Sequence, residues 1–231
     1  MKSIQKSFLF VFVVAVAIVF YLYSSAFWFG PKDLGVKYTE DDLSRISLAI
    51  GGDRIYPDDM SEDDDIFEDY YLNYSDPKAY NLEITGPELG AIIEEILPPA
   101  FPIKDLQMKI NDDDSVEVSC RANIGVLVEH FFSDVADDIP IKLPEKANIY
   151  LKGKLETTNG VSEVNIDEAK IGSISIPSKY LTPEKQVSIA RYADRFQTAA
   201  PGVVIRKLSF DNNKIIFDGD FPDSYYITSK G

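Results

Sequence analysis

The chain has 231 residues, of which 38 are acidic and 23 are Lys or Arg, so its formal net charge at neutral pH is −15. Phosphate backbones repel such an acidic surface, which excludes nucleic acid from the partners we expect. Cys120 is the only cysteine, so no disulfide can form within the chain and its stability must come from packing. Because Cys120 lies in an alternating apolar run, we expect a buried core residue rather than a nucleophile.

A long apolar run begins close to the N-terminus. Residues 8–29 contain no charged side chain. A helix of this length, rising about 1.5 Å per residue, can cross a hydrocarbon core of about 30 Å. We therefore predict a transmembrane anchor over residues 7–29 that holds the chain in the lipid bilayer. The alternative is a cleaved signal peptide, since residues 24–26 are small, but the run exceeds the apolar core of such a peptide.

The charges on the two sides of this run predict its orientation. Lys2 and Lys6 precede the run, and a strongly acidic chain follows it. Basic residues favour the cytoplasmic side, so we predict a single-pass protein of the cell membrane with residues 1–6 in the cytoplasm and an extracellular C-terminal domain. The outer part divides into a juxtamembrane helix with an acidic loop, residues 30–79, and an α+β domain, residues 80–231.

The first outer segment predicts a short helix followed by a loop. Thr39 can cap a helix whose first turn holds three acids, and Gly51 marks its end. Residues 53–76 carry many like charges without apolar periodicity, which predicts a solvated loop. Partial disorder of this loop is an alternative that the sequence leaves open. Calcium is the sharper alternative, but these acids lack the turn glycine and ordered ligands of a calcium loop. Ser75 and Lys78 share the Ser-x-x-Lys spacing of some acyl-transfer enzymes, although a neighbouring proline favours a turn.

The next forty residues predict a strand, a helix and a β-hairpin. Residues 80–84 alternate as a strand does, and Thr85 with Glu88 forms a capping box that opens a helix. Two segments, 103–110 and 116–120, flank a polar turn and predict the hairpin. Four apolar residues repeat at helical spacing before two prolines stop the helix, namely Leu89, Ile92, Ile93 and Ile96.

Residues 124–135 predict another helix, followed by a β-meander over residues 147–176. The helix contains His130, the only histidine, with no second histidine or cysteine beside it. We expect a packed or surface imidazole rather than a catalytic one. The pair Asn159 and Gly160 predicts a tight turn within the meander.

A second helix and hairpin follow. Residues 183–199 predict a longer helix with Ile189 and Phe196 as its apolar anchors, and residues 203–220 predict two strands joined by a turn. This unit repeats the order found over residues 85–120, which suggests two similar halves in which each twisted sheet wraps a helix. Chance agreement between common capping and hairpin signals is the alternative.

Two short stretches carry a resemblance to a known family. Residues 84–89 give a helix start, Ile-Thr-Gly-Pro-Glu-Leu, and residues 169–177 read Ala-Lys-Ile-Gly-Ser-Ile-Ser-Ile-Pro after a long strand pair. With the anchor, this order resembles the YpmS-like membrane-anchored proteins of Gram-positive bacteria and, more distantly, the tubular lipid-binding (TULIP) proteins. The resemblance implies an α+β fold in which a curved antiparallel β-sheet wraps helices around an apolar groove, with a lipid as ligand.

These patterns favour a binding protein over an enzyme. An anchored outer domain with amphipathic strands and an Ile-rich helix suits the binding of a lipid or another apolar envelope component. The expected ligand-binding residues are Leu89, Ile92, Ile93, Ile96, Ile189 and Phe196. The alternative is an interaction or scaffold module that binds an envelope protein through its acidic face and holds no small molecule. The sequence has no metal-ligand spacing, nucleophile elbow or phosphate loop, so we expect no enzyme activity, catalytic residue, metal or cofactor.

Overall fold

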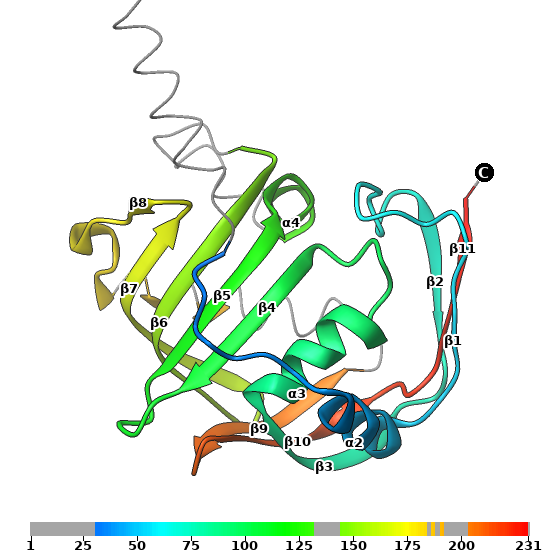
Figure 1. The fold of residues 1–231 in the computed structure, drawn as a ribbon, viewed down its shortest axis with the longest axis horizontal. Helices are drawn as coiled ribbons and strands as arrows, with labels where there is room; N and C mark the ends of the chain where they lie inside the picture. Colours follow the sequence, from blue (N-terminus) through cyan, green and yellow to red (C-terminus); the bar gives the residue numbers. More distant parts are fainter. Residues whose placement is uncertain (1–30, 132–143, 184–185, 188–189, 192–202, 231) are drawn as a thin grey trace, which may run out of the picture.

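Most of the described chain is β-sheet, with short helices between the strands. The computed structural model describes residues 31–131, 144–183, 186–187, 190–191 and 203–230. Within these residues the strands form one sheet of eight strands and another of three (Figure 1). The α+β class predicted from the sequence is therefore confirmed.

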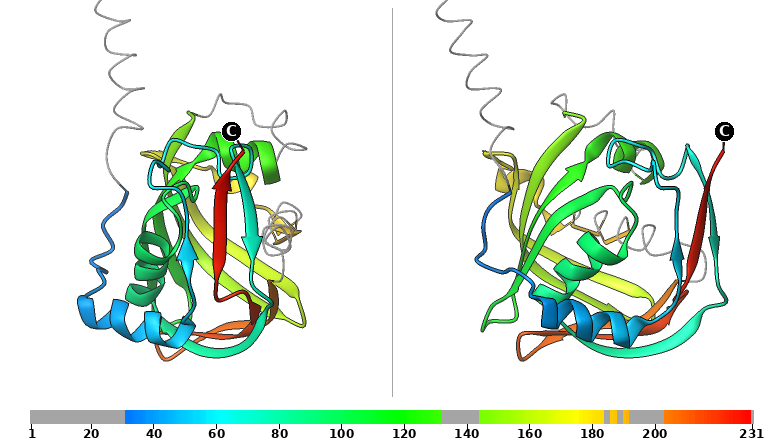
Figure 2. Two further views of the ribbon diagram at one scale, coloured as in Figure 1. Left: turned by 90° about the vertical axis from the view of Figure 1, so that its right-hand side faces the viewer. Right: turned by 45° about the vertical axis from the view of Figure 1, so that its right-hand side comes forward.

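The larger sheet is antiparallel in all its described pairings. Its strands are β3 Lys78–Thr85, β4 Ile103–Ile110, β5 Val116–Asn123, β6 Lys146–Thr158, β7 Val161–Ile171, β8 Ile174–Ser175, β9 Val204–Asp211 and β10 Lys214–Phe221. They lie in the order β3-β10-β9-β6-β5-β4, with β7 beside β6 and β8 beside β7. The sheet is strongly curved, so that β3, β9 and β10 pass beneath β4 to β7 (Figures 1 and 2). Both predicted hairpins and the meander are confirmed.

The smaller sheet joins segments from opposite parts of the chain. Its strands are β1 Arg54–Ile55, β2 Tyr70–Tyr74 and β11 Tyr225–Ser229. β11 lies between the other two, parallel to β1 and antiparallel to β2, as the left view of Figure 2 shows. The sequence did not predict this sheet.

The prediction of a solvated loop over residues 53–76 is wrong. This stretch forms β1 and β2. It also supplies Met60, Ile66 and Tyr70 to a second hydrophobic core, together with Ala100 and two residues of β11. The stretch is ordered because β11 supplies the pairing partner that its own sequence lacks, and because basic side chains elsewhere bind several of its acids.

Helix caps form where the sequence predicts them. The helices are α2 Glu40–Ile50, α3 Gly86–Ala91 and α4 Ile124–Phe131, with a π-helix η1 Ile92–Ile96 and a 3-10 turn η3 Ser178–Tyr180. At α2 the Asp42 amide donates to Thr39 Oγ1 at 3.3 Å, and the Thr39 amide donates to the Asp42 carboxylate at 2.8 Å. Thr85 and Glu88 exchange the same pair of bonds at α3. The predicted cap at Thr39 and the predicted capping box of Thr85 with Glu88 are confirmed, and Gly51 ends α2 with a positive φ of 67°.

The predicted continuous helix before the two prolines changes character halfway. After α3 the backbone widens into η1, where the Leu97 amide donates to the Ile92 carbonyl oxygen at 2.9 Å, five residues back. The helix then ends at Ile96, before Pro98, which cannot continue it. Sequence periodicity did not separate the two helix types.

The first hydrophobic core lies where α2, α3 and η1 pack against the larger sheet. Its buried members are Ile46, Ile50, Ile84, Ala91, Ile96, Ile110, Val116 and Ile215. Cys120 on β5 is buried, as predicted, and burial raises the pKa of its thiol to about 12. The described core therefore rests on close packing, in agreement with a chain that has no internal disulfide.

Three predicted features fall wholly or partly outside the described residues. They are the anchor over residues 7–29, most of the helix over residues 183–199, which includes Ile189 and Phe196, and the part of the helix over residues 124–135 that follows Phe131. Within the described part of the chain, no helix combines the length and the apolar character needed to cross a membrane.

Candidate functional site

An apolar cavity of about 370 Å³ lies between the smaller sheet, η1 and the β3–β10 part of the larger sheet. This volume falls in the lower part of the range of about 300–1,000 Å³ that is usual for small-molecule sites. Its lining residues are Ile50, Arg54, Ile66, Phe67, Leu72, Tyr74, Leu82, Ile84, Ile92, Ile96, Leu97, Pro98, Phe101, Val203, Phe217, Phe221, Pro222, Asp223, Tyr225 and Ile227. We call this space the apolar cavity.

Strand alternation explains why the walls are apolar. On β3, Leu82 and Ile84 point to the same face because side chains two apart share a side of a sheet. Phe217 on β10 is the register partner of Leu82 and extends that face. In the smaller sheet, Leu72 faces its partner Ile227 in the same way. Two sheet faces thus turn apolar side chains towards one space.

The Tyr80 and Phe221 rings strengthen the contact between β3 and β10. The two rings stack with centroids 4.0 Å apart, and Phe221 also meets Phe217 edge to face at 5.7 Å. Offset or edge contacts between aromatic rings stabilise their orientation beyond the burial of area. Phe217 and Phe221 are therefore held in place as part of the cavity wall.

Residues 57–69 close one end of the apolar cavity with Ile66 and Phe67. An ion pair joins Glu62 of this segment to Arg121 of the larger sheet at 3.0 Å, and a hydrogen bond joins Asp65 to His130 of α4 at 3.0 Å. Burial acts to raise the pKa of Asp65, but the bond from His130 and two backbone amides outweigh it and hold the pKa below its ordinary value. The predicted non-catalytic role of His130 stays a prediction. In the structure its side chain binds Asp65 beside the cavity.

Two charged residues interrupt the apolar lining, Arg54 and Asp223. The Asp223 carboxylate pairs with Lys78 and accepts a hydrogen bond from Ser75 Oγ at 3.1 Å. Lys78 above all lowers the pKa of Asp223, so this carboxylate is ionised and bound within the protein. Ser75 and Lys78, the residues of the Ser-x-x-Lys spacing, thus converge on Asp223, and Ser75 precedes a strand rather than opening a helix.

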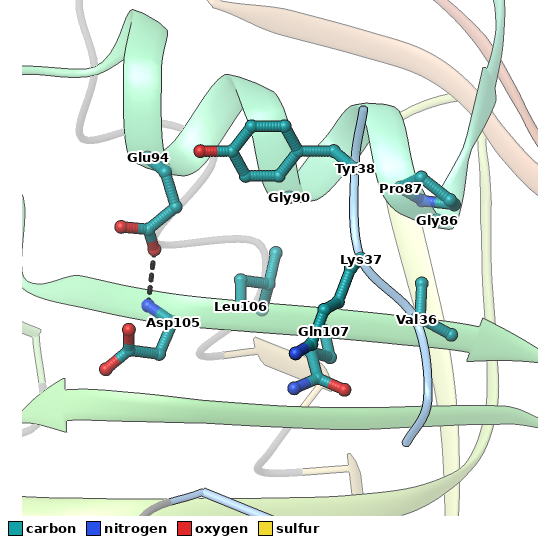
Figure 3. Close-up of a pocket in the computed structure, with 10 residues that line it drawn as sticks. All are labelled: Val36, Lys37, Tyr38, Gly86, Pro87, Gly90, Glu94, Asp105, Leu106 and Gln107. Atoms are coloured by element: carbon teal, nitrogen blue, oxygen red, sulfur yellow. Dashed lines mark hydrogen bonds between the residues drawn. The ribbon is translucent and has the colours of Figure 1, made fainter. Parts of the chain in front are cut away.

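A second hollow lies on the opposite face of α3 and η1 (Figure 3). It measures about 350 Å³, and we call it the N-terminal groove. Its lining residues are Val36, Lys37, Tyr38, Gly86, Pro87, Gly90, Glu94, Asp105, Leu106 and Gln107. The residues come from the segment before α2, from one face of the helix and from β4.

Hydrogen bonds cross the N-terminal groove and tie its walls together. The Leu34 amide donates to Gln107 Oε1 at 2.8 Å, and the Asp105 amide donates to Glu94, as drawn in Figure 3. Tyr38 donates to Glu95 at 2.5 Å, a bond that raises the pKa of Tyr38 to about 12. The N-terminal segment therefore packs onto the domain at this groove, and several of the polar groups there form hydrogen bonds across it.

Two of the predicted ligand-binding residues line the cavity and also pack in the first core, two line no part of the cavity, and two lie outside the described residues. Ile92 and Ile96 line the apolar cavity. Leu89 packs against the first core and Ile93 is buried, and neither lines the cavity. Ile189 and Phe196 lie outside the described residues.

Sequence reasoning missed the lining residues of β2, β10 and β11. Alternation in Tyr225-Tyr226-Ile227 was the available signal, since the first and third of these residues are buried and the second is 41% exposed. That signal is only three residues long. It also follows β9 and β10, which belong to the larger sheet, whereas β11 belongs to the smaller one. For calcium, the described residues contain no group of three or more acids, histidines or cysteines placed to hold a metal ion.

Comparisons with known proteins give no match. No protein-family model matches the chain, and no curated protein or solved structure does so either. What the protein does must therefore be inferred from the chemistry of sites such as these two, of which the cavity is apolar and the groove is bridged by hydrogen bonds.

Proposed function

We propose that this protein is a membrane-anchored extracytoplasmic binding protein that holds a lipid or another apolar envelope component in the apolar cavity. The observation that carries the proposal is a space of about 370 Å³ whose walls are apolar except for Arg54 and Asp223. Each methylene group moved from water into such a space contributes about 0.8 kcal/mol. A chain of about ten methylenes would therefore gain roughly 8 kcal/mol before the costs of association.

Packing supports the same proposal. Apolar walls without contacts on one side lose dispersion energy, and the measured cost of such cavities is about 24 cal/mol per Å³. An alkyl chain that fills the space restores those contacts. Ligand binding would thus stabilise the junction between the two sheets, where the first and second cores meet the cavity.

The proposal extends to the architecture and to the placement of the protein. A TULIP-like wrap of sheet around helix, as in the YpmS-like resemblance, is supported by the curvature of the larger sheet and by the position of α3 and η1 against it (Figure 2). The uncharged run over residues 8–29 supports an anchor in the membrane from which lipids are drawn. Neither feature involves enzyme chemistry.

The alternative, a scaffold that binds envelope proteins through the acidic loop, has less support. Several acids of residues 57–69 form contacts within the protein, including Glu62 with Arg121 and Asp64 with Tyr70. Bound acids offer less charge to a partner than free ones. Crosslinking in cells, with and without charge-neutralising changes at residues 58–69, tests this alternative directly.

Photolabelling tests the proposed function. The full-length chain in phosphatidylcholine vesicles is irradiated with dodecanol that carries a terminal diazirine, and labelled peptides are identified by mass spectrometry. We expect labels on peptides from β2, η1 and β10, with the peptide of residues 8–29 as the reference for exposure to the bilayer.

Two matched leucine variants make this test specific. Leu72→Trp fills the cavity and is expected to abolish labelling of the wall, whereas Leu48→Trp changes a residue of α2 that is 86% exposed and is expected to have no effect. Labelling restricted to residues 8–29, or equal labelling in both variants, would overturn the proposal. Thermal unfolding shows whether each variant is folded.

A further inference from the structure

Arg54 is the one cation among the described residues that line the apolar cavity. In the parallel pair of β1 and β11, Arg54 is the register partner of Tyr225 and Ile55 is that of Tyr226. Tyr225 is buried, while Ile55 and Tyr226 are 56% and 41% exposed. Because side chains alternate along a strand, Arg54 lies with Tyr225 on the inner face of the smaller sheet. Its charge is thus directed to the cavity side.

Most hydrogen-bond donors of Arg54 have no partner among the described residues. A guanidinium has five N–H donors, and the described contact of Arg54 is one bond from Nη2 to the Gly51 carbonyl oxygen at 2.8 Å. No carboxylate of the described chain forms an ion pair with Arg54, and Asp223, the acid on the same wall, is bound to Lys78. A cation left without a counter-charge on an apolar wall is unfavourable.

The tyrosines around Arg54 do not supply that counter-charge. Tyr225 donates its hydroxyl hydrogen to the Ile96 carbonyl oxygen, and Tyr80 donates to the Ile50 carbonyl oxygen at 2.9 Å. Burial raises the pKa of both phenols, against a smaller opposing effect of Arg54. Both rings are therefore neutral at physiological pH, and they leave Arg54 as a positive group facing the cavity.

On the basis of the proposed function, we infer that the ligand is a fatty carboxylate whose single alkyl chain fills the apolar cavity and whose head group binds Arg54. The planar guanidinium fork matches the two oxygens of a carboxylate and binds them with two parallel hydrogen bonds. A carboxylate carries one negative charge, which matches the single positive charge of Arg54. The volume of about 370 Å³ suits one chain rather than two.

The experiment compares two probes that differ at one end. Dodecanoic acid and dodecanol, each with the same terminal diazirine, are offered to the full-length chain in phosphatidylcholine vesicles at pH 8, where the acid is ionised. We expect the acid to label the peptides of β2, η1 and β10 at a concentration roughly tenfold or more below that of the alcohol, the usual effect of a hydrogen bond to a charged group. High salt should reduce this preference only slightly, because the pair is partly buried.

Variants of Arg54 locate the preference. Arg54→Gln should remove the advantage of the acid over the alcohol, whereas Arg54→Lys should retain part of it. Arg206→Gln is the matched control, since Arg206 on β9 pairs at the surface with Asp218 and Asp220. The comparison of probes on the unaltered chain needs no variant, so a failure of Arg54→Gln to fold leaves the test intact.

The outcomes separate this inference from the proposed function. If neither probe labels the cavity wall, the proposed function fails and this inference fails with it. If both probes label the wall equally, or if Arg54→Gln retains the preference for the acid, the cavity binds apolar chains but the role of Arg54 is refuted. Stronger labelling by the matching dodecylamine than by the acid would refute it as well.

Discussion

The two faces of α3 and η1 show how differently one helix can be used. Gly86, Gly90 and Glu94 face the N-terminal groove, where backbone and polar contacts bring the walls together. Ile92 and Ile96 face the apolar cavity, whose opposite wall belongs to another sheet. The first face uses small residues for close approach, and the second uses branched residues that leave space. The difference supports the proposal that a ligand binds in the cavity rather than in the groove.

Two isoleucine substitutions should give the largest effects, and they compare a position within the packed core with a position on the wall of the apolar cavity. Ile46 on α2 is 2% exposed within the first core, so Ile46→Ala should lower the free energy of unfolding by about 4 kcal/mol. Ile96 is also buried in the first core but borders the cavity on one side, so Ile96→Ala should cost about 2 kcal/mol. Urea denaturation of the two variants measures both values. Equal losses would show that the cavity wall is packed like the core.

Gly86→Ala should break the close approach on the groove face. A Cβ at this position would overlap the carbonyl oxygen of Met108 on β4, and backbone cannot yield as a flexible side chain does. We expect a loss of about 3 kcal/mol in the free energy of unfolding, at the upper end for overpacking. Gly125→Ala in α4 is the control, because its nearest neighbours would be 3.5 Å from the new Cβ. A loss no greater than that of the control would contradict the close packing described.

Thr85→Ala should weaken the start of α3 and loosen both faces together. The substitution removes the side chain that accepts from the Glu88 amide at 3.3 Å, and the expected cost is about 1 kcal/mol. Thr85→Ser keeps the hydroxyl and should restore most of that loss. Thermal unfolding of both variants measures the difference. An equal loss in the serine variant would assign the effect to the threonine methyl group and not to the cap.

Acid should loosen the closed end of the apolar cavity before it affects the groove. Arg121 lowers the pKa of Glu62, and a hydrogen bond from Tyr70 lowers that of Asp64. A carboxyl whose pKa is lowered on folding adds stability that is complete above its unfolded pKa of about 4 and is lost as the pH falls through the folded value. Hydrogen exchange in residues 57–69 should therefore accelerate below about pH 4.

Charge-neutral variants give the control for this small effect. Asp64→Asn should flatten the pH dependence of hydrogen exchange in residues 57–69, because an asparagine side chain does not titrate. Exchange in the segment of residues 34–38, beside the N-terminal groove, reports on the other face. Simultaneous acceleration in both segments would indicate global unfolding rather than opening of the cavity.

Local signals in the sequence predicted most individual elements. Thr39 and Gly51 mark the ends of α2, and Thr85 with Glu88 opens α3, because capping bonds form between residues three apart. The hairpins follow from alternation and turn residues in the same way. These features need no knowledge of distant parts of the chain.

The cavity could be predicted only in part because it is made by distant segments. Helical spacing grouped Leu89, Ile92, Ile93 and Ile96, but it could not show which of them face a packed core and which face a space. β11 pairs with β1 and β2, whose residues lie 151 to 171 positions before their partners in β11, in a segment whose sequence predicts a charged loop. Pairing over such distances leaves little trace in local sequence.

The central position of β11 in the smaller sheet sets an order of events during synthesis. β1 and β2 are made early, yet they do not pair with each other and must wait for residues 225–229 to reach them. Until then Leu72 and Tyr74 have no partner strand, and the wall they form is open. Closure of such a long-range contact is slow compared with the formation of helices. The wall of the apolar cavity that β1 and β2 supply is therefore completed only after residues 225–229 have been made.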